Sequence, residues 1–77
     1  MSNIKDISVS YKNAVVGTAA TGVWDKTDNS VTAEIVWKKE MINKQPLEVR
    51  FTTLRDVKVL KMQIGSINGK KAFLGPV

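Results

Sequence analysis

The 77-residue sequence contains no cysteine and no histidine, so it lacks most of the side chains that build active sites and metal centres. Disulfide bonds are impossible, and structural zinc sites use cysteine or histidine in almost every case. The glycine motifs that cradle phosphates are also absent. Since an enzyme needs a nucleophile, an acid or base, or a metal, we predict a protein that is not an enzyme and binds no cofactor or metal.

Long apolar runs are missing as well. The longest one, residues 14–20, is rich in small side chains and far shorter than the ~18 residues of a membrane span. Residues 1–6 lack the apolar core of a signal peptide. A chain of this length typically forms one domain. We therefore expect a single domain over residues 1–77, with no membrane span and a cytoplasmic location.

Apolar and polar residues alternate along most of the chain, which is typical of half-buried β-strands. The alternation predicts strands at residues 7–12, 14–24, 31–38 and 47–53, and a last strand that ends at 75–76. Three aromatic residues, Trp37, Phe51 and Phe73, occupy positions on the apolar faces of their strands. We expect these three rings to lie in the core.

A loop of turn-forming residues at 25–30 closes a long hairpin over residues 14–38. Asp25 and Asp28 lie in this loop, but it lacks the glycine and terminal glutamate of the known calcium loop. We interpret them as turn formers and not as metal ligands. Gly17 and Gly22 interrupt the first strand of this hairpin and indicate a bulge or a sharp bend.

Residues 39–46 break the alternation. Pro46 lacks an amide donor and belongs at a strand start or an edge, whereas Glu40–Lys44 has room for one helical turn at most.

Residues 54–64 are open to two interpretations. As a strand, Val57 and Val59 would share one face and Leu60 would take the other, which requires a bulge or burial on both sides. As a helix, the segment would be capped by Thr53. We favour the strand, because Asn68-Gly69 is the strongest short hairpin signal. This signal pairs Ile67 with Lys70 and places Ile64 opposite Phe73.

These patterns predict an all-β fold with at most one short helical turn. For 77 residues, the natural closure of five or six antiparallel strands is a small barrel or a strongly curled sheet, similar in size to OB or SH3-like domains.

The net charge of +5 is unevenly distributed along the chain. Residues 1–38 carry four lysines and four carboxylates, whereas residues 39–77 carry eight cations and three carboxylates. If the second half forms one surface, that surface attracts polyanions such as nucleic acid. The alternative is that these lysines only keep a small protein soluble.

The candidate residues for nucleic-acid binding are the basic side chains of the later strands and two aromatic residues next to lysines. They are Arg50, Arg55, Lys58, Lys61, Lys70, Lys71, Lys38 and Lys39, with Tyr11 and Trp24 as the better candidates among the aromatic residues for exposed rings. Basic grooves with aromatic rings hold single-stranded nucleic acid by stacking. For Lys70 and Lys71 a second interpretation stays open, since lysines on edge strands discourage aggregation.

Two functions therefore compete. The first is a non-enzymatic nucleic-acid-binding module, backbone-directed through a basic face in the C-terminal half, for single- or double-stranded partners. The second is a protein-interaction or assembly module, either an accessory inhibitor or a subunit of a symmetric homo-oligomer, with no nucleic-acid role. It rests on size, because a core this small supplies only about 3–5 kcal/mol of stability without a partner.

Overall fold

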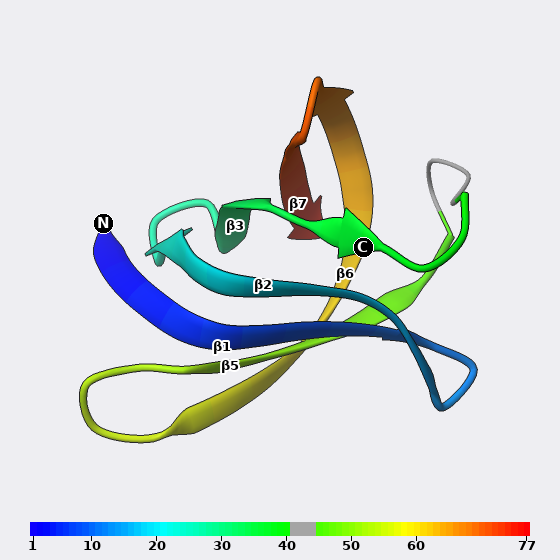
Figure 1. Ribbon diagram of the computed structural model, residues 1–77. Coiled ribbons are helices and arrows are strands. Elements are labelled where there is room, and N and C mark those ends of the chain that lie inside the picture. The colour runs from blue at the N-terminus through cyan, green and yellow to red at the C-terminus, as the bar shows by residue number, and fades with distance from the viewer. Residues whose placement is uncertain (41–44) are drawn as a thin grey trace.

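The computed structural model describes residues 1–40 and 45–77, and these residues form β-strands joined by turns (Figure 1). The strands are β1 (Ser2–Tyr11), β2 (Ala14–Asp25), β3 (Ser30–Glu34), β4 (Val36–Trp37), β5 (Leu47–Thr52), β6 (Val57–Asn68) and β7 (Lys71–Pro76). No helix occurs in these two ranges, which confirms the all-β prediction. The helical turn expected within 40–44 falls on residues 41–44, outside the described part of the chain.

Six of the strands close into an antiparallel barrel, as predicted. The strand order is β1-β5-β6-β7-β3-β2, and β1 also pairs with β2, so the ring has no open side. The short β4 pairs with β2 beyond the end of β3 and is separated from β3 only by Ile35. Pro46 directly precedes β5, where its missing amide donor costs no ladder hydrogen bond.

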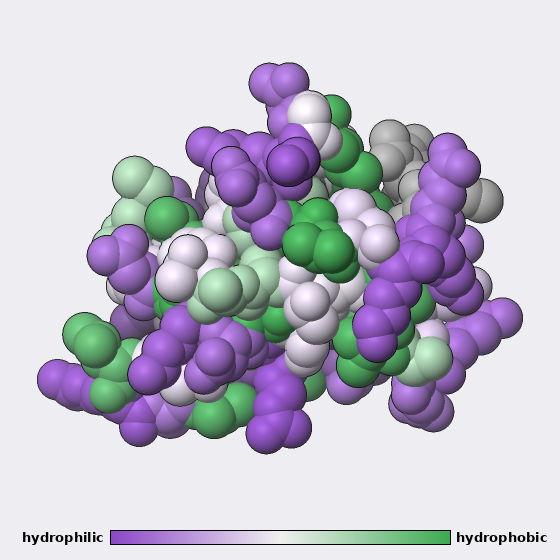
Figure 2. All heavy atoms as spheres, in the orientation of Figure 1, coloured by the Kyte–Doolittle hydropathy of each residue, from purple (hydrophilic) through white to green (hydrophobic). Residues whose placement is uncertain are grey.

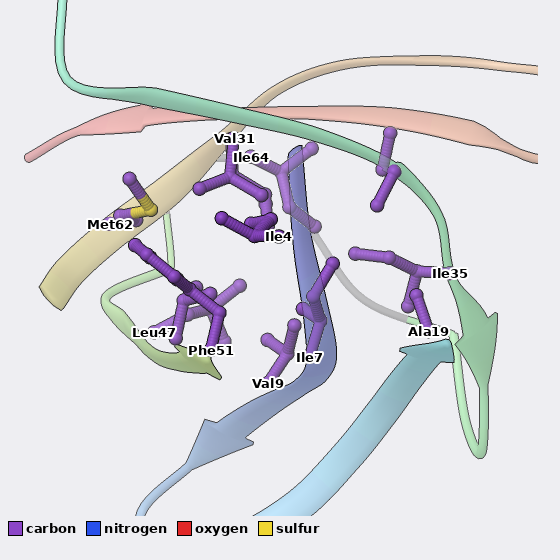
Figure 3. Close-up of a cluster of buried hydrophobic side chains, with 14 of the residues drawn as sticks. Ile4, Ile7, Val9, Ala19, Val31, Ile35, Leu47, Phe51, Met62 and Ile64 are labelled. Carbon is purple, nitrogen blue, oxygen red and sulfur yellow. The ribbon is translucent and has the colours of Figure 1, made fainter. Parts of the chain in front are cut away.

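Inward-facing side chains from all six barrel strands fill the core (Figure 3). The largest of the fully buried side chains are Phe51, Ile7, Met62, Ile64, Leu74, Val9, Val16, Val31 and Val49. Phe51 lies in the core as expected, whereas Trp37 is only half-buried and packs against the core from its margin. The alternating pattern therefore placed Phe51 correctly and Trp37 only in part.

At two glycines of β2, neighbouring side chains come so close that an added Cβ would collide with them. A Cβ at Gly17 would lie 2.7 Å from Ile35 Cγ2, and a Cβ at Gly22 would lie 2.7 Å from Ile7 Cδ1. The bulge predicted near Gly17 is present, since the β1–β2 register shifts between Val9 and its neighbour Ser10. At Gly22 the pairing with β1 is regular, so limited space and not a bulge explains this glycine.

The pairing of the β6–β7 hairpin differs from the prediction by two residues next to the turn and by one residue beyond the register shift between Ile64 and Ser66. Asn68 pairs with Lys71, so that Gly69 and not Asn68 opens the two-residue turn. Gly69 has a φ of 63°, a conformation that glycine adopts without steric cost. Beyond the register shift, Ile64 pairs with Leu74 and not with Phe73, which brings Leu74 into the core and leaves Phe73 38% exposed. The prediction that Phe73 is a core residue is therefore wrong, because a slip of one residue exchanges the two faces of a strand.

The strand interpretation of residues 54–64 is confirmed from Val57 onward, and the helix interpretation is wrong. No reversal of faces occurs before Ile64, because Val57 and Val59 point outward and remain about half exposed while Met62 is buried. The irregularity lies later, as a register shift between Ile64 and Ser66.

Candidate nucleic-acid interface

The outer face of β5 and β6 carries two of the predicted cations on neighbouring strands. Arg50 pairs with Val59 on β6 and with Ser8 on β1, so its cross-strand neighbours are uncharged. Lys61 pairs with Glu48, which offsets part of its charge. Both cations are exposed. Of these two cations, Arg50 is therefore the one without an acidic cross-strand partner.

An open hollow of about 790 Å³ lies at the end of the barrel beside the β5–β6 turn. Its lining includes Trp24, Lys26, Leu54, Arg55, Asp56 and Lys58. Two predicted site cations, Arg55 and Lys58, therefore meet here with a third cation, Lys26. The ion pair between Lys58 Nζ and Asp56 Oδ2, at 3.8 Å, is the only one within residues 1–40 and 45–77.

The turn that borders this hollow is held by the side chain of Thr53. The Thr53 hydroxyl accepts hydrogen bonds from the backbone amides of Arg55 (3.2 Å) and Asp56 (3.0 Å), and it lies 2.7 Å from Asp56 Oδ1, to which it donates. The Thr53 amide donates to the Asp56 carbonyl at 2.8 Å. Leu54 is fully exposed at the tip. Such local side-chain bonds fix a turn without help from the core, so Arg55 projects from a defined backbone.

Trp24, one of the two candidates for an exposed ring, is buried and only 8% exposed. It pairs directly with buried Val31 of β3, and its ring lies 5.2 Å from that of Phe51 with an interplanar angle of 52°. The indole Nε1 donates to Asn29 Oδ1 at 3.4 Å. Lys26 Nζ lies 5.5 Å from the ring centroid. Trp24 was a candidate for exposure because it lies next to a loop, but its side chain is on the inward-facing side of β2.

Tyr11 marks the far end of β1 and is half-buried. The Nζ atoms of Lys12 and Lys39 lie 5.3 Å and 6.0 Å from its ring centroid, within the range of a cation–π contact. Lys38 is held at the start of the following segment, because its amide donates to the Val16 carbonyl at 2.8 Å. This end of the barrel therefore gathers basic side chains around one aromatic ring.

A smaller hollow of about 230 Å³ connects the Tyr11 end with the outer face of β5 and β6. Lys12 and Lys61 both line it, together with Glu48 and Pro46. Lys61 thus lies on the face that carries Arg50 and also lines a hollow together with Lys12, whose ammonium lies beside the Tyr11 ring.

Lys70 and Lys71 lie elsewhere, on the β6–β7 hairpin that projects away from the β5–β6 turn (Figure 1). Lys71 pairs with Asn68 across the turn and with Glu34 of β3. The structure therefore separates these two candidates from Arg50 and Lys61, although Lys61 and Lys71 lie on adjacent strands and Lys70 lies in the turn between them.

Sequence reasoning did not select Lys12 and Lys26, which lie close to the rings of Tyr11 and Trp24. In the sequence, Lys12 follows Tyr11 directly and Lys26 lies two residues after Trp24, and this proximity to an aromatic residue at a strand end could have identified both lysines.

Figure 2 shows hydrophilic side chains over much of the visible face, with apolar groups between them.

Within the two described ranges, no three acidic side chains come close enough to hold a metal ion. In the same ranges no helix is long and apolar enough to cross a membrane.

The fold and the surface define a small closed antiparallel β-barrel with cations at both ends of its β5–β6 pair. No family model matches the chain, and no curated protein or solved structure matches it either.

Proposed function

We propose that this protein is a non-enzymatic nucleic-acid-binding module that contacts phosphates along β5 and β6. The surface concerned is a basic band, formed by Arg50 and Lys61 in the middle, Arg55 and Lys58 at the hollow, and Lys12 and Lys39 at Tyr11. The β5–β6 ladder runs from Thr52–Val57 to Leu47–Met62, which corresponds to roughly 17 Å at 3.4 Å per residue. The band is thus long enough for several consecutive phosphates.

The observation that carries this proposal is the shortage of acidic partners along the band. Lys58 is the one cation of the described residues with a carboxylate within ion-pair distance, and Arg50 has only uncharged cross-strand neighbours. Cations that are not paired within the protein are available to displace counterions from a nucleic-acid backbone.

The middle of the band favours contact with phosphates over contact with bases. Val57 and Val59 lie beside Arg50 and no aromatic ring stands on this stretch of β6. Base recognition by single-strand binders relies on aromatic stacking. We therefore expect binding with little sequence preference and a strong dependence on salt.

Fluorescence anisotropy with labelled single- and double-stranded oligonucleotides at several salt concentrations tests this function. We expect a Kd below about 100 μM at low salt, because non-specific binders reach that range even at physiological salt. The variant Arg50→Ala/Lys61→Ala should lower the salt slope by about 1.4 for a single strand, at roughly 0.7 per phosphate contact.

The matched control is Lys70→Ala/Lys71→Ala, which removes the same charge from the projecting hairpin. The slope of this control should stay within error of the unmodified protein. Equal losses in the two variants would show that only net charge matters, and absence of binding at low salt would remove the function altogether.

Assembly is the second candidate function, and it is favoured by apolar exposure on β6. Val57 and Val59 are 48% and 51% exposed, and Leu54 lies nearby at the turn. Light scattering coupled to size-exclusion chromatography distinguishes the two functions. Val59→Lys should dissociate an oligomer built on this face, whereas it should leave a monomer's mass unchanged and strengthen its oligonucleotide binding.

A further inference from the structure

We infer that the hollow beside the β5–β6 turn is a nucleotide site, in which the cations hold a phosphate and Trp24 with Leu54 contacts the base. This inference rests on the proposed function and deepens it, because it assigns one end of the basic band to a strand's terminal nucleotide. The lining of the hollow combines three cations, an aromatic ring and an apolar side chain.

The charge of the hollow suits a phosphate. Lys26, Arg55 and Lys58 outnumber the single carboxylate of Asp56 among the lining side chains. That carboxylate is engaged already, by the Thr53 hydroxyl at 2.7 Å and by the Lys58 ammonium at 3.8 Å. The excess of positive charge therefore remains for an anionic ligand.

Side chains and not backbone amides would make the phosphate contacts. The amides of Arg55 and Asp56 both donate to the Thr53 hydroxyl, so the turn offers no free anion nest at these two positions. Arg55 supplies a planar fork that bonds two phosphate oxygens at once, while a lysine acts as a point charge. We expect Arg55 to be the main phosphate contact.

The apolar part of the hollow is suited to more than a phosphate. Its volume of about 790 Å³ lies in the range of small-molecule sites, about 300–1,000 Å³, and inorganic phosphate would leave most of it empty. Leu54 is fully exposed at the turn, and Trp24, although only 8% exposed, is among the residues that line the hollow. A base placed between them would bury apolar surface on both sides.

Lys26 links the two parts of the site. Its ammonium lies 5.5 Å from the centroid of the Trp24 ring, while Phe51 packs against the same ring. A base that contacts Trp24 would displace this ammonium, which then becomes available to the phosphate. Ligand binding should therefore change the surroundings of Trp24 and of Lys26 together.

Tryptophan fluorescence tests the inference directly, in the variant Trp37→Phe, where Trp24 is the only tryptophan and is excited selectively over Tyr11. Adenosine monophosphate should change the emission in a saturable manner, at least tenfold more tightly than adenosine or inorganic phosphate alone. Arg55→Ala/Lys58→Ala should weaken nucleotide binding at least tenfold. Arg50→Ala/Lys61→Ala should leave it within twofold, although it weakens oligonucleotide binding.

Amide chemical shifts of the unmodified protein provide a second readout that needs no substitution. Nucleotide should shift the signals of Lys26 and Arg55 and leave that of Lys71 in place. If nucleotide leaves both readouts unchanged while oligonucleotides still bind through Arg50, the nucleotide site is wrong and the proposed function stands. If phosphate alone binds as tightly as nucleotide, the contact with Trp24 is wrong.

Discussion

The two halves of β6 belong to the same strand but to different surfaces. Residues 57–62 pair with β5 and form part of the barrel wall, while residues 62–68 pair with β7 in a projecting hairpin. Met62 and Ile64, where the strand changes partner, are buried, whereas every residue from Gly65 to Asn68 is exposed. The cations of adjacent strands therefore do not form one face, because the strand that joins them changes partner halfway.

The turns at the two ends of β6 are also stabilised in different ways. The β5–β6 turn is held by hydrogen bonds from the Thr53 side chain. The β6–β7 turn depends on the positive φ of Gly69, around which no heavy atom would contact an added Cβ. The first turn is stabilised by its side chains and the second by backbone conformation alone.

Substituting the phenylalanine that pairs with each half of β6 should give the largest difference in the free energy of unfolding. Phe51 pairs with the first half and is fully buried, so Phe51→Ala should lower the free energy of unfolding by about 3–5 kcal/mol. Phe73 pairs with the second half and is 38% exposed, so Phe73→Ala should cost well under half as much. Urea denaturation followed by circular dichroism measures both.

Because a loss of this size could prevent folding of the alanine variant, Phe51→Leu serves as the milder form, with an expected cost of about 1–1.5 kcal/mol. Equal costs for Phe51→Leu and Phe73→Leu would contradict the assignment of the two rings to core and surface.

Gly69→Ala should have an intermediate effect. An alanine at a φ of 63° is destabilised by roughly 1–2 kcal/mol, and since nothing crowds the position, backbone strain is the only cause. Gly69→Asn is the control, because asparagine tolerates left-handed backbone, and it should recover most of the loss. If the asparagine variant is as unstable as the alanine variant, the turn does not have this conformation in solution.

Thr53→Ala should have the smallest effect on stability, about 1 kcal/mol for the lost hydrogen bonds of an exposed turn. Thr53→Ser keeps the hydroxyl and should behave as the unmodified protein. Amide hydrogen exchange at Arg55 and Asp56 should accelerate only in the alanine variant; unchanged exchange there would mean that the hydroxyl does not hold the turn.

The alternation of side chains predicted the all-β fold and most of the strands, but it missed residues 2–6 of β1 and the break at Ile35 between β3 and β4. Residues 47–52 form a strand as expected, and the hairpin closed at 25–30 appears with Asp25 paired to Ser30. The failures come from bulges, which leave no clear trace in a period of two. Ile4 and Ile7 are both buried although they are three residues apart, because Asp6 between them has a positive φ of 53° and the β1–β5 register shifts there.

The sequence was sufficient to predict which basic residues are candidates for the site, but not which of them lie close together. The sequence indicated which residues are basic, yet the separation of Lys71 from Lys61 depends on where β6 leaves β5. The loop beside Trp24 made it a candidate for an exposed ring, while the residue itself faces inward beside Val31. Both features depend on contacts between distant segments, which one sequence does not reveal.

The position of β1 between β2 and β5 has a consequence during synthesis. The β1–β2 hairpin can form as soon as both strands are made, but Val9 pairs with Val49, some 40 residues further along the chain. Until β5 leaves the ribosome, one edge of β1 presents unpaired backbone donors and acceptors, which is where intermolecular strand pairing begins. Such distant pairing also slows folding. Closing the ring is thus the step that ends the nascent chain's exposure to aggregation.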